Sequence, residues 1–180
     1  MRRLKPGVVI TTIALMALLG VPALSLAQTT HTAELDATHE LPTCFSSGQG
    51  TFTATINEEN TEIDYELSYD SLAGTVTQAH IHFGKPFEQG SIVVFLCSNI
   101  APPPADLPPA TPACPLSSGT VMGTLNASSV LNRAAAQGIG TGEFEKLLVA
   151  IRFGEGFTYA NIHTTLCTPG EIRGQIQPGS

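Results

Sequence analysis

Basic residues are scarce in this 180-residue sequence, and they are unevenly distributed. Three of the eight, Arg2, Arg3 and Lys5, lie at the N-terminus, whereas all fifteen acidic residues follow residue 27. From Gln28 onwards, five Lys and Arg residues stand against fifteen Asp and Glu residues, a net charge of −10. Without a basic patch the chain is a poor partner for nucleic acid, and we expect none. Its negative field favours solubility and attracts cations.

Long apolar runs are also missing. The longest, Val8–Leu19, has about a dozen residues, whereas a membrane-spanning helix needs roughly 20. The basic start, this run and the closing Ser25-Leu26-Ala27 form the pattern that a signal peptidase reads. We therefore predict a signal peptide over residues 1–27 and a secreted or periplasmic protein without a membrane span after cleavage. Retention of the segment as an anchor is the competing interpretation.

No two cysteines are close enough in sequence for a CxxC motif. An even number of cysteines in an exported chain predicts disulfides, and four cysteines permit three pairings. Cys97 and Cys114 bracket a Pro-rich segment, residues 98–113, so we expect them to pair at its base. This leaves Cys44 with Cys167. A Cys₄ metal site is the alternative, which the missing CxxC spacing disfavours.

Known catalytic motifs are absent as well. The sequence has no GxSxG, no HExxH and no phosphate-binding glycine loop. A cysteine nucleophile conflicts with the predicted disulfides. We assign no catalytic residue, and a non-enzymatic protein is the favoured interpretation, although an enzyme stays open.

Strand patterns dominate what is present. Apolar and polar residues alternate with a period of two over residues 63–69, which is typical of a strand with one solvated face. The turn-forming residues 57–60 join this run to the preceding one as a hairpin. Strands are predicted at residues 33–37, 51–56, 63–69, 76–83, 92–97, 120–125, 158–163 and 171–176. We predict one all-β domain over residues 28–180, a Greek-key β-sandwich or flattened barrel of about eight strands.

Two short helices are expected late in the chain, before the seventh strand. The first covers residues 128–137, with Asn126 as N-cap and Gly138 at its end. The second covers residues 143–153, where apolar residues recur at i, i+3, i+4 and i+7 and should pack on the sheet.

A Pro-rich segment lies between the two cysteines expected to pair. Residues 101–115 hold seven of the thirteen prolines, a composition that favours extended, exposed backbone. We expect a surface loop, and contact with a partner is the sharper alternative.

Two histidines share one strand. Residues two apart on a strand point to the same face, about 7 Å apart along the backbone, so His80 and His82 lie on one side. The other side is apolar and should face the core, which would place the two imidazoles on the solvated face. The residues of that apolar side are Ala79, Ile81 and Phe83.

A third histidine falls on a later strand. His163 shares its face with Asn161 and Tyr159. If the two strands are neighbours, three imidazoles converge and can bind copper or zinc, with an open position for water or substrate. The alternative is structural: the histidines fix strands or loops through hydrogen bonds, with Asn161, Thr164 and Glu171 as partners.

Arg173 lies on the last predicted strand. It shares a face with Glu171, whereas Ile172, Gly174 and Ile176 lie on the other face. We interpret Arg173 as forming a salt bridge or a hydrogen-bond fork to a loop carbonyl, with an anion site as the alternative. Gly174 suggests a close backbone approach.

Three segments together resemble the CHRD (chordin) domain family, in its bacterial exported type. They are residues 79–84 (AHIHFG), 159–164 (YANIHT) and 169–176 (PGEIRGQI), within a similarity over about residues 33–177. The resemblance implies an extracellular β domain and brings no catalytic activity. It implies a non-enzymatic binding or structural module of the cell envelope or secretome, whose partner is an unknown extracellular or periplasmic protein.

The segment His80–Gly84 also looks like the HVHxFG copper-binding strand of copper/zinc superoxide dismutases. The zinc-binding His and Asp residues of those enzymes have no clear match here, and His31 and His39 lie in a different context. This second resemblance implies, as an alternative function, a periplasmic or secreted copper- or zinc-binding protein that uses His80, His82 and His163.

Overall fold

The computed structural model describes residues 28–153 and 156–179, and the predicted signal peptide lies outside them. In this part of the chain, nine antiparallel strands form one sheet in the order β5-β4-β7-β8-β1-β2-β3-β6, with the short β9 added to β1. The strands are β1 (Thr29–Asp36), β2 (Gln49–Ile56), β3 (Ile63–Asp70), β4 (Val76–Phe83), β5 (Ser91–Ser98), β6 (Gly119–Leu125), β7 (Thr158–Thr164), β8 (Ile172–Gln175) and β9 (Gln177–Pro178).

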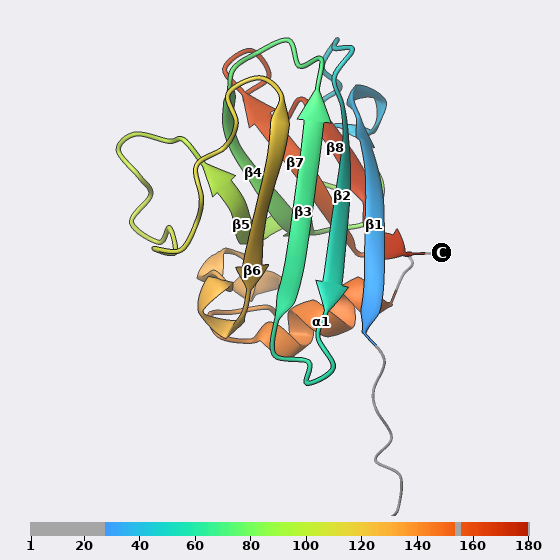
Figure 1. Ribbon diagram of the computed structural model, residues 1–180, viewed down its shortest axis with the longest axis vertical. Helices are drawn as coiled ribbons and strands as arrows, with labels where there is room; N and C mark the ends of the chain where they lie inside the picture. Colours follow the sequence, from blue (N-terminus) through green and yellow to red (C-terminus); the bar gives the residue numbers. More distant parts are fainter. Residues whose placement is uncertain (1–27, 154–155, 180) are drawn as a thin grey trace, which may run out of the picture.

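The sheet bends into two facing layers (Figure 1). One layer contains β1, β2, β3 and β6, and the other contains β4, β5, β7 and β8. The layers join where β8 meets β1, at the single pair Asp36–Arg173. The chain crosses between layers after β3 and again after β5, so that β6 returns beside β3. This arrangement confirms the predicted all-β sandwich or flattened barrel.

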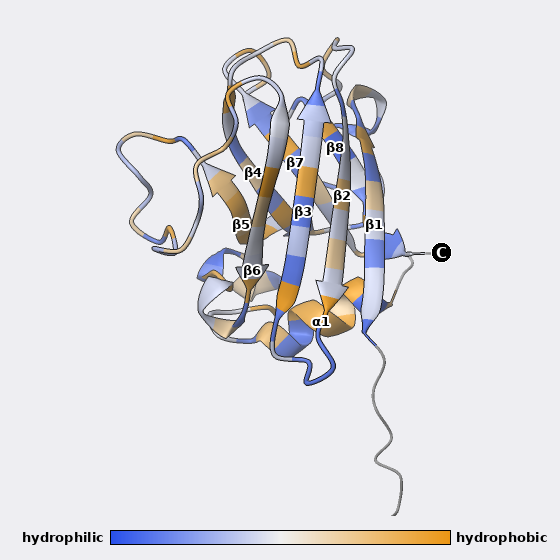
Figure 2. Ribbon diagram, viewed as in Figure 1, coloured by the Kyte–Doolittle hydropathy of each residue, from blue (hydrophilic) through white to orange (hydrophobic). Residues whose placement is uncertain are grey.

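The inner faces of the two layers enclose the hydrophobic core. Phe52 and Leu67 enter it from one layer, and Ile81 and Ile162 enter it from the other. The alternation along the strands is visible in the hydropathy colours of Figure 2. At the junction of the layers the backbones approach so closely that a Cβ on Gly174 would lie 2.1 Å from the carbonyl oxygen of Glu34, which confirms the expected close approach.

One α-helix, α1 (Phe144–Arg152), covers an end of the sandwich (Figure 1). It confirms the prediction for residues 143–153 to within a residue at each end. The helix buries an apolar stripe and exposes its charged side chains, because every third or fourth residue is apolar. The stripe consists of Phe144, Leu147, Leu148, Ala150 and Ile151.

The continuous helix predicted over residues 128–137 is wrong. Two short 3₁₀ helices, η2 (Ala127–Ser129) and η3 (Asn132–Gln137), take its place, and a further one, η1 (Ala37–His39), ends the first strand early. The interruption has a tertiary cause. Val130 and Leu131 are extended and buried, and the N–H of Leu131 donates to the carbonyl of Val93 on β5. The predicted cap, Asn126, and terminating glycine, Gly138, are both confirmed.

The Pro-rich segment between β5 and β6 extends outward from the sandwich (Figure 1). Across residues 28–153 and 156–179, no helix is both long enough and apolar enough to span a membrane.

Candidate metal centre

Neighbouring strands bring the three predicted histidines together. β4 pairs with β7 in a register that sets His80 opposite Asn161 and Gln78 opposite His163. The ring centroid of His80 lies 5.4 Å from that of His82 and 5.0 Å from that of His163. One nitrogen of each ring lies within 4.8 Å of the other two. The predicted convergence of three imidazoles is therefore what the fold produces.

The cluster is buried, which corrects the expectation of a solvated face. His80, His82 and His163 are 0%, 7% and 8% exposed. They do lie opposite the core-facing residues of β4, as predicted. Loops cover this outer face: the β4–β5 loop contacts His82 through Gly90, and the β7–β8 loop contacts His163 through Thr168. Strand alternation identifies which residues share a face but carries no information about what covers it.

Two backbone carbonyls orient two of the rings. His82 Nδ1 lies 2.9 Å from the carbonyl oxygen of Gly90, and His163 Nδ1 lies 2.9 Å from that of Thr168. A carbonyl only accepts, so in both rings Nδ1 carries the hydrogen and Nε2 keeps a free lone pair. A backbone carbonyl on the second ring nitrogen is the usual support of a metal-binding histidine.

Four ring nitrogens of the cluster have no hydrogen-bond partner among the described residues. They are Nε2 of His82, Nε2 of His163, and both nitrogens of His80. Each is shielded from solvent, so each is a buried polar atom whose lost hydration is not replaced. Such a group calls for an explanation, and a metal ion is one that would engage three of these atoms at once.

Burial keeps the three rings neutral. Desolvation lowers the pKa of His82 to about 4 and holds that of His80 well below its usual value, with the neighbouring histidines adding to the shift. Burial also lowers the pKa of His163, although its bond to Thr168 acts in the opposite direction. A metal ion would therefore meet little competition from protons at pH 7.

Aromatic rings form the walls of the cluster. Phe95 of β5 contacts the ring of His80 edge to face, with centroids 4.6 Å apart. Tyr159 of β7 stacks on His82, with centroids 4.7 Å apart and planes inclined by 9°. These contacts restrict both imidazoles and lower the polarity around them.

Arg173 lies on the other face of Tyr159, its guanidinium carbon 3.3 Å from the ring centroid. Although charged, it is 1% exposed. It donates to the carbonyls of Lys85 at 2.9 Å and Glu88 at 2.8 Å, which confirms the predicted fork to loop carbonyls. Because these residues belong to the loop that also supplies Gly90, Arg173 stabilises the loop conformation that orients His82.

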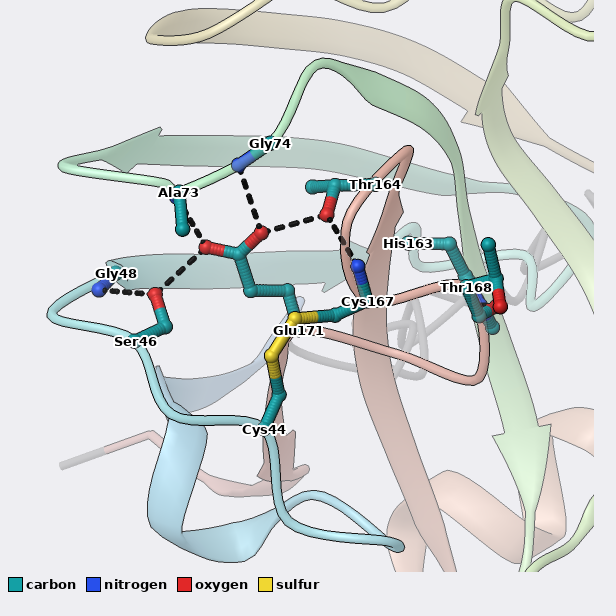
Figure 3. Close-up of a disulfide and its surroundings, with 10 residues drawn as sticks. All are labelled: Cys44, Ser46, Gly48, Ala73, Gly74, His163, Thr164, Cys167, Thr168 and Glu171. Atoms are coloured by element: carbon teal, nitrogen blue, oxygen red, sulfur yellow. Dashed lines mark hydrogen bonds between the residues drawn. A yellow bond between two sulfur atoms is a disulfide. The ribbon is translucent and has the colours of Figure 1, made fainter.

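Glu171 is a structural anchor rather than a partner of the histidines. Its carboxylate accepts hydrogen bonds from the backbone N–H groups of Ala73 and Gly74 and from the hydroxyls of Ser46 and Thr164 (Figure 3). Burial alone would raise the pKa of Glu171, but these hydrogen bonds lower it. The hydrogen bonds predicted from Thr164 and Glu171 to the site histidines are therefore wrong, because the two residues bond each other.

Asn161 lies between the cluster and a buried acid. Its Nδ2 lies 3.4 Å from a carboxylate oxygen of Glu40, and its Oδ1 has no partner among the described residues. Burial raises the pKa of Glu40, although hydrogen bonds from Leu41 and Asn161 oppose the shift. Sequence patterns gave no reason to single out Glu40, and the carbonyls of Gly90 and Thr168 have no side-chain signature at all.

The cysteines pair as predicted, Cys44 with Cys167 and Cys97 with Cys114, which excludes the alternative Cys₄ metal site. The first disulfide joins the loop before β2 to the turn that carries Thr168 (Figure 3). The second closes the base of the Pro-rich loop, where Ser98 also bonds to the carbonyl of Pro112.

Fold and site together define a disulfide-linked antiparallel β-sandwich with a buried three-histidine cluster on the outer face of one layer. The family model described as CHRD domain matches residues 31–176. The chain therefore belongs to the CHRD domain family, as its three motifs predict. Nothing among curated proteins, and nothing among solved structures, matches it.

Proposed function

We propose that this CHRD-domain protein is exported and binds one transition-metal ion, copper or zinc, through His80, His82 and His163. The observation that carries the proposal is the convergence of three neutral imidazoles whose unpartnered nitrogens lie within 4.8 Å of one another. Copper and zinc both accept imidazole ligands at about 2.0–2.1 Å. Ligand nitrogens around one such ion stand roughly 3.4 Å apart, so a small inward shift of the rings would complete the site.

Energetics favour this function over purely structural histidines. A buried imidazole nitrogen without a partner costs on the order of 1–3 kcal/mol. A structural role would be better served by apolar side chains of the same size, which carry no such cost. The fixed Nδ1–H groups of His82 and His163 further support a metal, because they direct two lone pairs into the cluster.

Export is supported by the redox chemistry of the chain. Both disulfides need an oxidising compartment to form and persist, as in secreted or periplasmic proteins. The same compartments expose a protein to the metal ions of the cell envelope, so the site and the location are compatible.

A titration with matched variants tests the metal proposal. The chain has five histidines, so the triple variant His80→Ala/His82→Ala/His163→Ala can be compared with the control His31→Ala/His39→Ala, which leaves the cluster intact. Copper and zinc binding are measured by calorimetry on oxidised protein, with circular dichroism to verify folding. One ion bound at micromolar affinity or better in the wild type and control, but not in the triple variant, supports the proposal. Equal, weak binding in all three rejects it.

A second candidate function is a non-enzymatic binding module whose Pro-rich loop contacts a protein of the cell envelope. The outward extension of this loop favours it (Figure 1). Two features keep the loop in place, the Cys97–Cys114 disulfide at its base and the hydrogen-bonded ion pair between Asp106 and Arg133, with a shortest N–O distance of 2.6 Å. A variant with residues 101–111 replaced by a short Gly-Ser linker should lose association with isolated envelopes while keeping its metal affinity. Unchanged association would reject this function.

A further inference from the structure

We infer that the three-histidine site selects monovalent copper, Cu(I), over the divalent ions Zn(II) and Cu(II). The inference rests on the proposed metal function and names its ion. It depends on the charges around the cluster, where the three ligands are neutral and a buried arginine lies nearby.

The ligands bring no negative charge. The group of potential ligands within 4.8 Å of one another contains three histidines and, within the described residues, no carboxylate or thiolate. A divalent ion bound there would leave two uncompensated positive charges in a buried site, whereas Cu(I) would leave one. The cost of burying an ion rises steeply with its charge, so this difference favours the monovalent ion.

A permanent cation lies next to the site. Arg173 is buried and has no carboxylate oxygen within 4 Å in the described part of the chain, where its hydrogen bonds go to uncharged oxygens. Its guanidinium stacks on Tyr159, which stacks on His82. The positive charge is therefore separated from His82 by a single aromatic ring. Arg173 therefore repels any cation in the site, and repels a dication twice as strongly.

The other charged groups near the cluster offset this effect only in part. Arg133 also acts on His80, but it pairs with Asp106 at 2.6 Å. Two carboxylates act electrostatically on Arg173, that of Glu40, which is buried beside Asn161, and that of Glu88. Neither forms an ion pair with Arg173 within 4 Å in the described part of the chain, so the two carboxylates offset its charge only in part.

The number of ligands that the cluster offers also favours Cu(I) over Zn(II). Zn(II) in proteins takes four ligands, and a catalytic site supplies three and leaves the fourth to water or substrate. The wall of Phe95 and Tyr159 and the low exposure of the three rings leave little room for solvent at a fourth position. A low-coordinate ion of single charge fits the cluster better.

The test compares affinities under anaerobic conditions, with a chromogenic Cu(I) chelator as competitor for copper and a Zn(II) chelator for zinc. We expect the wild type to bind Cu(I) at least a thousandfold more tightly than Zn(II). A unit charge about 10 Å away at an effective dielectric constant of about 20 changes affinity roughly tenfold for each charge on the ion. Arg173→Gln should therefore shift the Cu(I)/Zn(II) affinity ratio about tenfold toward zinc. It should also lower the reduction potential of bound copper by about 59 mV.

Two further variants separate charge from packing. Arg173→Lys keeps the positive charge but loses the paired hydrogen bonds to the loop carbonyls. Because the loop is loosened, this variant should bind both ions more weakly and leave the ratio of their affinities unchanged. Glu40→Gln removes a negative charge that offsets Arg173 and should move the ratio toward Cu(I). The ratio is the informative quantity, because a loosened loop affects both ions alike.

The outcomes are distinct. Zinc affinity equal to or above that for Cu(I), or a ratio that Arg173→Gln does not move, overturns the selectivity while leaving the metal site intact. Absence of binding by any of the three ions overturns the proposed function itself.

Discussion

His82 donates its Nδ1 hydrogen to the carbonyl oxygen of Gly90 at 2.9 Å, and this bond directs Nε2 toward the other two histidines. The two residues are eight positions apart, one at the end of β4 and one in the loop that follows. His163 makes the same kind of hydrogen bond to the carbonyl oxygen of Thr168. A site built in this way depends on the conformation of its loops as much as on its three side chains.

Replacing His80 of the histidine cluster should stabilise the protein in the absence of metal. Both ring nitrogens of His80 are buried without partners, so His80→Leu, which is close in volume, removes an unsatisfied polar group. We expect a gain of about 1–2 kcal/mol in the free energy of unfolding, measured in urea without metal, together with loss of metal binding. Destabilisation by more than about 1 kcal/mol would show instead that His80 has a structural partner.

Stability should fall as the pH drops below about 6.5. The buried histidines have lowered pKa values in the folded state, whereas in the unfolded chain they take up protons near pH 6.5. Their contribution is therefore complete above pH 6.5 and is lost as the pH falls toward the folded-state value, about 4 for His82. For His82 alone the loss approaches about 3 kcal/mol by pH 4, measurable as unfolding midpoints in urea across this range. His82→Leu should flatten the profile, and an unchanged profile in this variant would contradict the prediction.

Gly174 should tolerate no side chain. A Cβ there would lie 2.1 Å from the backbone oxygen of Glu34, at the only point where β8 pairs with β1 in the described sheet. Gly174→Ala should cost more than about 3 kcal/mol, because two backbone segments would have to separate. The control is Gly142→Ala, where φ is +79° but no atom lies within 4 Å of the new Cβ. That variant should cost only about 1–2 kcal/mol by thermal or urea unfolding, and equal losses at the two glycines would contradict the close approach.

The two disulfides should differ in their contribution to stability. Cys44–Cys167 closes a loop with a sequence separation of 123, whereas Cys97–Cys114 closes one of 17. Loop-closure entropy predicts losses of about 5 and about 3 kcal/mol when the pairs are replaced by alanine. Urea unfolding of the two double variants measures the difference. Equal losses would mean that residual structure in the unfolded chain already restrains the longer loop.

Sequence patterns alone were enough to predict the secondary structure of the strands, the pairing of the cysteines and the identity of the three histidines. Alternation with a period of two assigns residues to faces, and this is why His80 and His82 were correctly placed opposite Ala79 and Ile81. The bracketing of the Pro-rich segment by two cysteines was a local signal, and the structure follows it. The CHRD motifs are likewise continuous segments of sequence, so the family could be recognised without the fold.

Tertiary structure decided the rest. Helical propensity over residues 128–137 gave way to two short 3₁₀ helices, because Leu131 donates to the backbone of β5. The face of β4 that alternation predicts as solvated became the buried site, because the loops through Gly90 and Thr168 cover it. The absence of an ion pair at Arg173 within the described residues also arose only on folding. The positions of backbone carbonyls and the distances between charges depend on the folded chain and cannot be read from residue types. The sequence therefore identified the three histidines, but not their burial, their tautomers or the charges around them.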